Sequence, residues 1–498
     1  MARINGEKLI VLGIDAGDLD FIRSRQSKLP TFRRLLGDTK VFQPQAPKAL
    51  SGSVWPTFYT GSAPGHHGIY QHLVWDADKM GLRLIGPEWC ARRPFWADLE
   101  DKGRKVTVLD VPYTFPIFLK RGVEISDWGT HGQTRPLSSN RSDVKKFLSK
   151  FGKSPIGRET PIKKTARQRD KIYKKLLAGV QRKRDLIVAL NKSFPSDVLI
   201  ASFGETHRAG HIFYSQADAV SEDQSDTCLL GIYRELDQAL NCILESVDRE
   251  KTTIVLFSLH GMMADYGQGH LVKPLMDRLN ALFIKRHAAP ETPGRNSGGV
   301  IRWLRQVAPT TLQYMLAEAA PDRIRQWVIE REIVEGIDWS KTPAFPLRTD
   351  IRAELRLNLL GRESQGFLEI DGSLRQIYTE WLHRAFLELK DKDTGQALVD
   401  EVVPIQKIFP GKYSHALPDF AITWRAAPLA HRVSSSVIGD IQAVPGGARG
   451  GDHTDFGFAA ISASTAVRKH LCTNSVPRIK HIWELARLIT RLDELADD

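Results

Sequence analysis

Cysteine is scarce in this sequence of 498 residues, and its four cysteines are dispersed. They are Cys90, Cys228, Cys242 and Cys472, with no CxxC pair among them. Cysteines at such spacings argue against a disulfide framework and against a thiolate zinc site. The pattern is typical of a reducing compartment, and we expect the four side chains to be small buried hydrophobic groups.

Long hydrophobic runs are absent as well. No apolar stretch approaches the roughly 20 residues that would span a bilayer. Residues 1–8 lead directly into an apolar segment, without the pattern of a signal peptide. Apolar residues make up 42% of the chain and charged residues 26%, which is ordinary for a globular protein. We therefore expect a cytoplasmic protein without a transmembrane segment.

Charge is the composition's main bias, because the net charge is +12 at pH 7. A positive field of this kind attracts anions, including phosphate esters, nucleotides, nucleic acid and acidic lipid. Many of the basic residues fall within 163–184, where apolar residues recur at roughly helical spacing. A solvated face of a basic amphipathic helix is the favoured interpretation, over a nucleic-acid or membrane surface. We expect a small anionic substrate and do not expect nucleic acid as a partner. The oligomeric state stays open.

Apolar runs typical of strands alternate with helical patterns over roughly the first 260 residues. The clearest runs are 9–14, 106–111, 198–203 and 254–258. Such alternation predicts an α/β fold with a mostly parallel central sheet and helices on both of its faces.

The order of these patterns divides the chain into three predicted parts. Residues 1–271 form the α/β core, with 113–195 as an inserted basic helical excursion. Residues 272–415 form a smaller cap domain, since the alternation ends there. Residues 416–498 return to the core sheet, beginning with a strand at 419–424, and end in an amphipathic helix.

Groups suited to chemistry follow several of the predicted strands. In open α/β sheets, ligands bind at the carboxyl ends of the strands, so polar groups there converge in one crevice. Imidazoles, a carboxylate and a hydroxyl in one crevice are what a hydrolytic metal centre requires. The candidates are Asp15, Ser51, His207, His211, His260 and His453.

These motifs resemble the alkaline phosphatase superfamily, in particular its type I phosphodiesterase/nucleotide pyrophosphatase members and the predicted phosphohydrolase/phosphomutase branch. The strand that ends at Asp15 matches the family's first metal aspartate. The segments 55–61 and 64–69 resemble its nucleophile helix and the turn that follows. Counting back from Thr60 and Gly61 places Ser51 at the position of the family's nucleophilic threonine or serine.

The resemblance implies two adjacent metal positions. One would be formed by His207, His211 and His453, and the other by Asp15, Ser51, His260 and position 259. His207 replaces a family aspartate, and Leu259 replaces another, so both changes remove a negative charge from the metal cluster. Three neutral imidazoles make a site well suited to Zn²⁺. We expect one tightly held divalent metal, most simply zinc, with a weaker second position.

Each candidate also has a simpler interpretation. His207 and His211 are four residues apart and share a helical face, where such pairs are commonly surface groups. In the alternative interpretation, His260 no longer binds a metal and packs under the sheet. Ser53 is an alternative to Ser51 as the nucleophile.

Other polar residues near the motifs are assigned less specific roles. His66 and His67 are expected to fix their loop by hydrogen bonds. Asn358 and Arg362 either face the site or stabilise a turn. Possible indirect supports or general acids are Glu205, Arg208, Asp265, His270, Asp452 and Asp455.

Three functions fit these observations. The first is a metal-dependent hydrolase of a phosphate ester or phosphodiester. The second keeps the fold but runs a different transfer or lyase-type reaction on an anionic metabolite. The third is a non-catalytic anion-binding protein. The first is the leading interpretation, and the third is opposed by five candidates that stand at matching positions, namely Asp15, Ser51, His211, His260 and His453.

Overall fold

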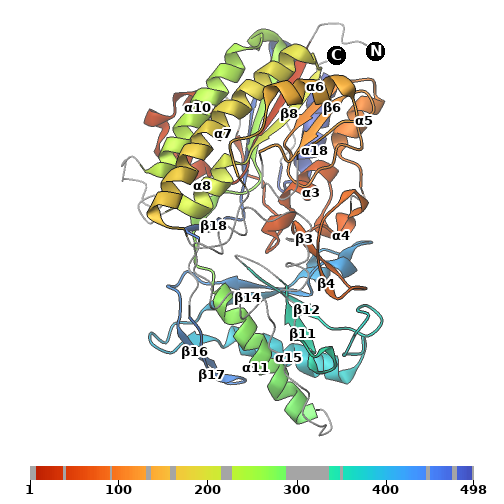
Figure 1. Ribbon diagram of the computed structural model, residues 1–498, viewed down its shortest axis with the longest axis vertical. Helices are drawn as coiled ribbons and strands as arrows, with labels where there is room; N and C mark the ends of the chain where they lie inside the picture. The colour runs from red at the N-terminus through yellow and green to blue at the C-terminus, as the bar shows by residue number, and fades with distance from the viewer. Residues whose placement is uncertain are drawn as a thin grey trace.

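The computed structural model of the protein has two regions (Figure 1). One region is built on an eight-stranded sheet and the other on a four-stranded sheet. The structure describes residues 7–37, 41–89, 92–129, 136–157, 164–214, 227–287, 336–347, 352–444, 449–473 and 479–495. Within the predicted cap domain, the proline- and glycine-rich sequence of 288–299 predicts a loop followed by helices, and these segments lie outside the described residues. Among the described helices, none has the length and apolarity that a membrane span requires.

The eight-stranded sheet is mostly parallel, which confirms the predicted fold class. Its strand order is β2-β19-β9-β1-β8-β5-β6-β7, and its central strands from β9 to β6 all run parallel. The outer strands β19, β2 and β7 pair antiparallel. The strands are β1 (Lys8–Ile14), β2 (Val41–Phe42), β5 (Val106–Leu109), β6 (Val123–Ser126), β7 (Leu137–Ser138), β8 (Val198–Phe203), β9 (Thr252–Ser258) and β19 (Phe458–Ser462).

The stretch 113–195 is only partly an excursion from this sheet, so that prediction is corrected. β6 and β7 fall within this stretch and form one edge of the sheet. β6 has only four residues and includes the buried polar residues Glu124 and Ser126, so it lacks a continuous apolar run. Without that run, the strand was not recognised from the sequence.

Helices cover both faces of the sheet because its strands are apolar on both sides. Along β1, Ile10, Leu12 and Ile14 enter one apolar cluster, whereas Leu9 and Val11 enter another. The first face is covered mainly by α2 (Pro30–Gly37), α7 (Ala166–Ser193), α8 (Glu205–Phe213) and α10 (Cys228–Glu245). The second is covered mainly by α3 (Val54–Thr60), α5 (Phe95–Asp101), α17 (Thr465–Thr473) and α18 (Glu484–Leu495).

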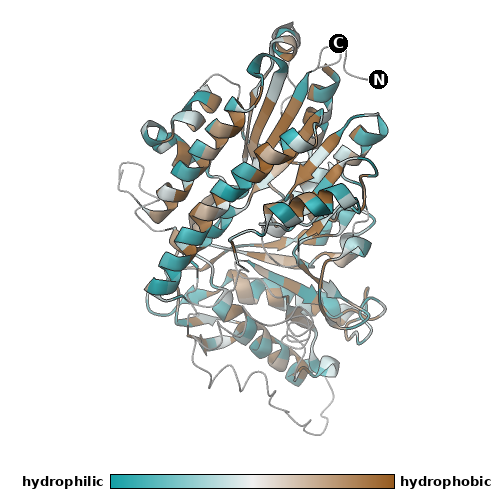
Figure 2. Cartoon of the chain, turned by 45° about the horizontal axis from the view of Figure 1, so that its top comes forward, coloured by the Kyte–Doolittle hydropathy of each residue, from teal (hydrophilic) through white to brown (hydrophobic). Residues whose placement is uncertain are grey.

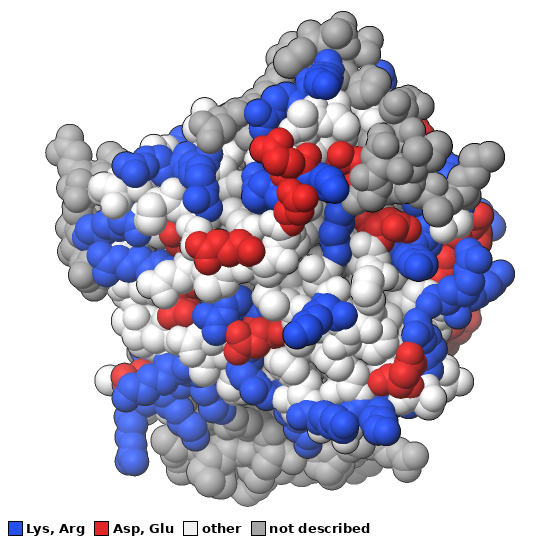
Figure 3. All heavy atoms as spheres, turned by 90° about the horizontal axis from the view of Figure 1, so that it is seen from above, with Lys and Arg blue, Asp and Glu red and all other residues white. Residues whose placement is uncertain are grey.

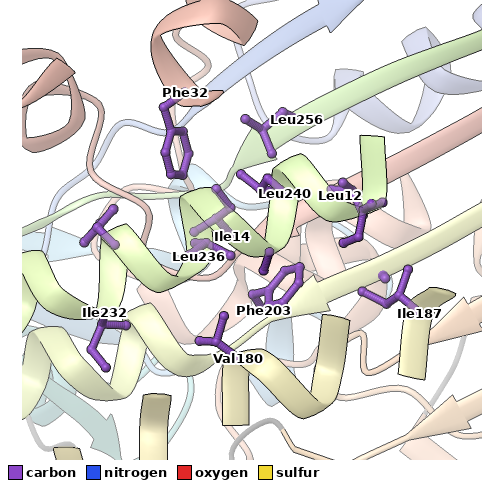
Figure 4. Close-up of a cluster of buried hydrophobic side chains, with 14 of the residues drawn as sticks. Leu12, Ile14, Phe32, Val180, Ile187, Phe203, Ile232, Leu236, Leu240 and Leu256 are labelled. Carbon is purple, nitrogen blue, oxygen red and sulfur yellow. The ribbon is translucent and has the colours of Figure 1, made fainter. Parts of the chain in front are cut away.

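Helix α7 is the basic helix that the sequence indicated. Its apolar residues, including Val180 and Ile187, pack against Leu236 and Leu240 of α10 and against the sheet (Figure 4). Figure 2 shows the hydrophobic sides of such helices turned toward the brown strands. On the face seen in Figure 3, basic side chains are scattered with acidic ones between them. In α7 itself, Lys171, Lys174 and Arg182 are exposed, so the solvated-face interpretation describes this helix well, except for one buried lysine that is discussed below.

The second region is built on an antiparallel sheet with the order β11-β12-β15-β14. Its strands are β11 (Ala344–Pro346), β12 (Ala353–Leu357), β14 (Val399–Pro404) and β15 (Phe420–Trp424), and helices α11 (Gly269–His287) and α15 (Ser373–Leu387) pack on it. β15 was expected to return to the first sheet, and that prediction is wrong. It pairs with β12 and β14, because a short apolar run does not encode its partner strand. The return comes later, at β19.

A hairpin from the N-terminal half joins the two regions. Strands β3 (Leu73–Asp76) and β4 (Gly81–Leu84) share an apolar cluster with the second sheet. The ring centroids of Trp75 and Phe345 lie 4.6 Å apart there. The chain segment after Ser51 is therefore packed against the second region.

The prediction of four buried cysteines is wrong for two of them. Cys228 and Cys242 are free and exposed, because both lie on the outer side of α10, away from its apolar face. Cys90 and the side chain of Cys472 lie outside the described residues.

Candidate metal centre

The candidate ligands come from adjacent strands of the first sheet. Asp15 directly follows β1, and His260 follows β9 by two residues. His207 and His211 lie on α8, which begins right after β8. Because β8, β1 and β9 are neighbours that run parallel, their carboxyl ends meet at one edge. His453 is brought to the same edge by β18 (Gly451–His453), which pairs with β10 (Met262–Ala264), just beyond His260.

Three buried histidines form a compact group of possible metal ligands. One nitrogen from each of His207, His211 and His453 lies within 4.8 Å of the others. The Nε2 atoms of His207 and His211 are 3.1 Å apart. Two nitrogens that ligate one zinc ion tetrahedrally, each at about 2.0–2.1 Å, are separated by roughly 3.3 Å. The observed separation is therefore close to that of a shared ion.

The protonation of these rings also suits a metal. A carbonyl only accepts hydrogen bonds, so the 2.7 Å contact with Gly451 O makes His211 Nδ1 a donor, and Nε2 is the nitrogen that would ligate a metal. Burial lowers the pKa of His453 well below its usual value, and the neighbouring imidazoles lower it further. Neither ring nitrogen of His453 has a hydrogen-bond partner within the described part of the chain. A buried imidazole that is neutral and lacks partners fits a metal ligand.

Asp15 and His260 lie beside this group of three. Asp15 Oδ2 is 4.0 Å from His207 Nδ1, and Asp15 Oδ1 is 3.7 Å from His260 Nε2. The rings of His260 and His453 have centroids 4.1 Å apart. All five candidates therefore share one buried cluster. Leu259, in contrast, packs into the apolar cluster on the second face of the sheet and has no ligand atom.

Ser51 lies at the start of a short 3₁₀ helix, Ser51–Ser53, and is half-buried. Four residues later, the indole nitrogen of Trp55 donates a 2.9 Å hydrogen bond to Asp15 Oδ1. The segment that carries Ser51 is thus tied to the histidine cluster through Asp15. Ser53, the competing candidate, is fully buried and its hydroxyl donates to Leu50 O, which favours Ser51 as the more accessible hydroxyl.

The supporting residues behave in different ways. His67 fixes its loop as expected, since its ring contacts the Thr57 hydroxyl at 3.0 Å and accepts from Ile69 N. Asn358 is fully buried and donates to two backbone carbonyls, and Arg362 pairs with Asp419 at 2.7 Å. Both therefore stabilise the second region's turn, which was one of the two interpretations.

His270 and Asp455 are held by contacts with the second region. His270 Nε2 donates to Ala430 O at 2.8 Å, and Asp455 pairs with Arg352 at 2.7 Å. Burial raises the pKa of Asp452 to about 7, although Arg352 opposes this rise.

Glu205 belongs to a buried ion cluster under α8. Lys183 Nζ lies 2.9 Å from Asp110 and 3.4 Å from Glu205, and all three side chains are fully buried. Burial alone would lower the pKa of Lys183, but the two carboxylates outweigh it and raise that pKa. The cluster keeps a charged lysine within α7 and ties α7 to the N-terminus of α8.

Two arginines near the site were missed from the sequence. Arg449 Nη1 lies 3.2 Å from His211 Nε2, next to the glycine-rich turn before β18. Arg352 reaches the loop after His453 from the second region. An arginine within a glycine-rich segment was the available signal for Arg449, whereas Arg352 had none.

A family model described as "Type I phosphodiesterase / nucleotide pyrophosphatase" matches residues 9–282, more than half of the chain. The chain belongs to this family. It is therefore a hydrolase of the phosphodiesterase/nucleotide pyrophosphatase type, and the matched residues include every candidate except His453. A search among curated proteins gives no match.

Solved structures show the same fold at low sequence identity. Phosphonoacetate hydrolase from Sinorhizobium meliloti 1021 in complex with phosphonoformate is 12% identical, with a TM-score of 0.54 over 98% of this chain and 96% of that one. Its complex with phosphonoacetate gives 13% identity and a TM-score of 0.53, with the same coverage. Murine ectonucleotide pyrophosphatase/phosphodiesterase 5 in complex with AMP gives 11% identity and a TM-score of 0.43 over 97% of this chain and 99% of that one. The first two establish an alkaline phosphatase-like fold.

Proposed function

We propose that this protein hydrolyses a phosphate ester or phosphodiester, with one zinc ion held by His207, His211 and His453. The observation that supports this most is the convergence of three buried imidazoles at the edge where the parallel strands β8, β1 and β9 end. Zinc bound there would supply Lewis-acid polarisation of the phosphoryl group. Ser51 is the proposed nucleophile.

The protein's own side chains have distinct tasks in this proposal. The Ser51 hydroxyl oxygen attacks phosphorus as the ester bond to the leaving alcohol breaks, and the hydroxyl proton passes to the departing alcohol oxygen. Water later hydrolyses the phosphorylated serine, which restores the hydroxyl and releases the phosphate product. The Arg449 guanidinium, beside His211, binds the phosphoryl oxygens and stabilises their charge. Asp15 faces His207 Nδ1, so it orients that ring with its other nitrogen toward His211.

A second metal position is weaker because it has few anionic groups. Asp15 and His260 contribute one carboxylate and one imidazole, and Leu259 contributes no ligand. Two dications a few Å apart repel strongly unless anionic groups surround them. We therefore assign one tightly bound ion, with any second ion held less firmly.

The same proposal includes a small anionic substrate and a cytoplasmic location. Both rest on the composition, namely the net charge of +12 and the dispersed cysteines.

The experiment measures zinc content and turnover of 4-nitrophenyl phosphate and bis(4-nitrophenyl) phosphate by the full-length chain. Ser51→Ala should retain zinc but lose on the order of 1,000-fold or more in kcat. Ser51→Thr is the matched control and should remain active, because the family accepts either hydroxyl. Wild-type turnover by Ser51→Ala would remove Ser51 as the nucleophile. A zinc-loaded wild type that binds phosphate but hydrolyses neither ester would favour the non-catalytic alternative.

A further inference from the structure

Strand β12 of the second region presents a polar face toward the first region. Its side chains point alternately to the two faces of the sheet, as in any strand. Ala353, Leu355 and Leu357 enter the apolar core of the second sheet. The opposite face carries Arg352, just before the strand, Glu354 and Arg356. Two of these, Arg352 and Glu354, contact residues of the first region.

Glu354 connects this face to the segment that carries Ser51. Its side chain is buried, with 2% exposure, and Oε1 accepts a long hydrogen bond of 3.5 Å from Gln71 Nε2. The Gln71 carboxamide lies over Gly52, where an added Cβ would be 2.6 Å from Gln71 Cδ. Gly52 directly follows Ser51. The other oxygen, Glu354 Oε2, is buried and has no hydrogen-bond partner among the described residues.

Arg352 connects the same face to the loop that carries His453. Its Nη2 pairs with Asp455 at 2.7 Å, two residues after that histidine. Its Nη1 is buried and, in the described ranges, has no hydrogen-bond partner. A buried donor and a buried acceptor without partners therefore lie on one strand face, between the nucleophile segment and the histidine cluster.

A hydroxyl group placed between Arg352 Nη1 and Glu354 Oε2 would satisfy both atoms at once. It accepts from a guanidinium N–H through a lone pair and donates its own hydrogen to a carboxylate. Against the ionised carboxylate, neither a phosphate oxygen, which only accepts, nor an ammonium, which only donates, matches the pair as fully. Burial raises the pKa of Glu354 to about 8. A hydroxyl fits the protonated acid as well, because it can accept from the acid's O–H.

We propose that Arg352 and Glu354 bind a hydroxyl group on the alcohol part of the substrate, so that the site prefers phosphate esters of polyols or sugars. This inference rests on the proposed function, because it assumes that the phosphoryl group lies between Ser51 and the histidines. Leaving both polar atoms unpaired is unfavourable, and that penalty would disappear when the hydroxyl binds.

The test measures binding, so that it does not depend on turnover. Calorimetry on the zinc-loaded full-length protein compares glycerol 3-phosphate with propyl phosphate, which lacks hydroxyl groups. Wild type should bind glycerol 3-phosphate roughly 10-fold or more tightly, as expected for hydrogen bonds that involve a charged group. Glu354→Met and Arg352→Met should each reduce the preference to near one, with little change for propyl phosphate. Glu354→Gln keeps a hydrogen-bonding group and should retain most of the preference.

The matched control is Arg425→Met, an exposed arginine of the same region, which should behave as wild type. If Arg352→Met fails to fold, Glu354→Met decides the question alone. The inference would be overturned if wild type bound the two esters equally or bound neither. An unchanged preference in Glu354→Met would overturn it as well. A preference that the variants abolish, without any hydrolysis, would support the inference and refute the proposed reaction.

Discussion

The two regions contribute polar groups to the site in different ways. The first region supplies them from the ends of adjacent parallel strands, which brings Asp15, His207 and His260 to one edge. The second supplies them from one face of an antiparallel strand, where Arg352 and Glu354 face away from the apolar core. Parallel strand ends collect residues that are distant in sequence. The polar face of an antiparallel strand, in contrast, contributes to a site only where another part of the protein packs against it.

The regions also differ in how they arrange buried charge. In the first, Lys183 is shared between Asp110 and Glu205. In the second, Arg356 pairs with Glu363 at 2.6 Å, and Arg362 pairs with Asp419 at 2.7 Å. One cation balances two carboxylates in the first arrangement, whereas two arginines balance two carboxylates in the second, where Arg362 also pairs with Glu363 at 3.0 Å. The first arrangement should therefore depend more on a single side chain.

The largest expected effect concerns the metal held by the strand-end residues. His211→Ala removes one of three ligands, so the purified protein should lose its stoichiometric zinc. Metal content is measured by elemental analysis after dialysis. His66→Ala changes an exposed histidine outside the cluster and should retain the metal. Stoichiometric zinc in His211→Ala would show that the metal lies elsewhere.

The next effect sharpens the comparison of buried charges. Lys183→Met leaves two carboxylates without their cation and should lower the free energy of unfolding by about 3–5 kcal/mol. Arg362→Met should lower it by less, about 1–3 kcal/mol, because Glu363 keeps Arg356 and Asp419 still accepts from Leu357 N. Urea unfolding measures both, with the exposed Lys174→Met as the control. Equal losses for Lys183→Met and Arg362→Met would contradict this difference between the regions.

A smaller, pH-dependent effect concerns the strand face. Burial raises the pKa of Glu354 to about 8, above the roughly 4.3 of an unfolded chain. Between these values the folded protein holds a proton that the unfolded chain has released, so wild type loses stability as the pH rises. Glu354→Gln does not titrate and should gain stability relative to wild type, on the order of a few kcal/mol, from pH 5 to pH 8. Urea unfolding at both pH values tests this.

The control for that experiment is the exposed Glu380→Gln, which should follow wild type at both pH values. If the difference between Glu354→Gln and wild type is the same at pH 5 and pH 8, Glu354 does not carry a raised pKa.

The smallest expected effect concerns the second metal position. Leu259→Asp would place a carboxylate near Asp15 and His260, and should strengthen binding of a second dication by roughly 10-fold. Since Leu259 is buried in an apolar cluster, the variant should also be less stable without metal. Metal titration beside wild type, with Leu259→Asn as the uncharged control, measures the change. Two tightly bound ions already present in wild type would refute the single-metal proposal.

The sequence could predict the first sheet because its central strands are continuous apolar runs. The same runs located Asp15, His207 and His260, since a residue after such a strand must lie at the sheet's carboxyl edge. His453 was found through its glycine-rich motif and the family resemblance, not through a strand pattern. β6 and β15 were misplaced, because a short strand carries little information about its neighbours.

The sequence by itself determined the α/β class and the ligand types at the strand ends, because periodicity and local order are properties of the chain. Only the tertiary structure decided that Lys183 is buried, that Arg449 lies beside His211, and that Arg352 and Glu354 face the site. These depend on which surfaces pack together between segments that are separated along the chain. No local pattern specifies such a contact, because burial of a charged side chain is set by its partners in space and not by its neighbours in sequence.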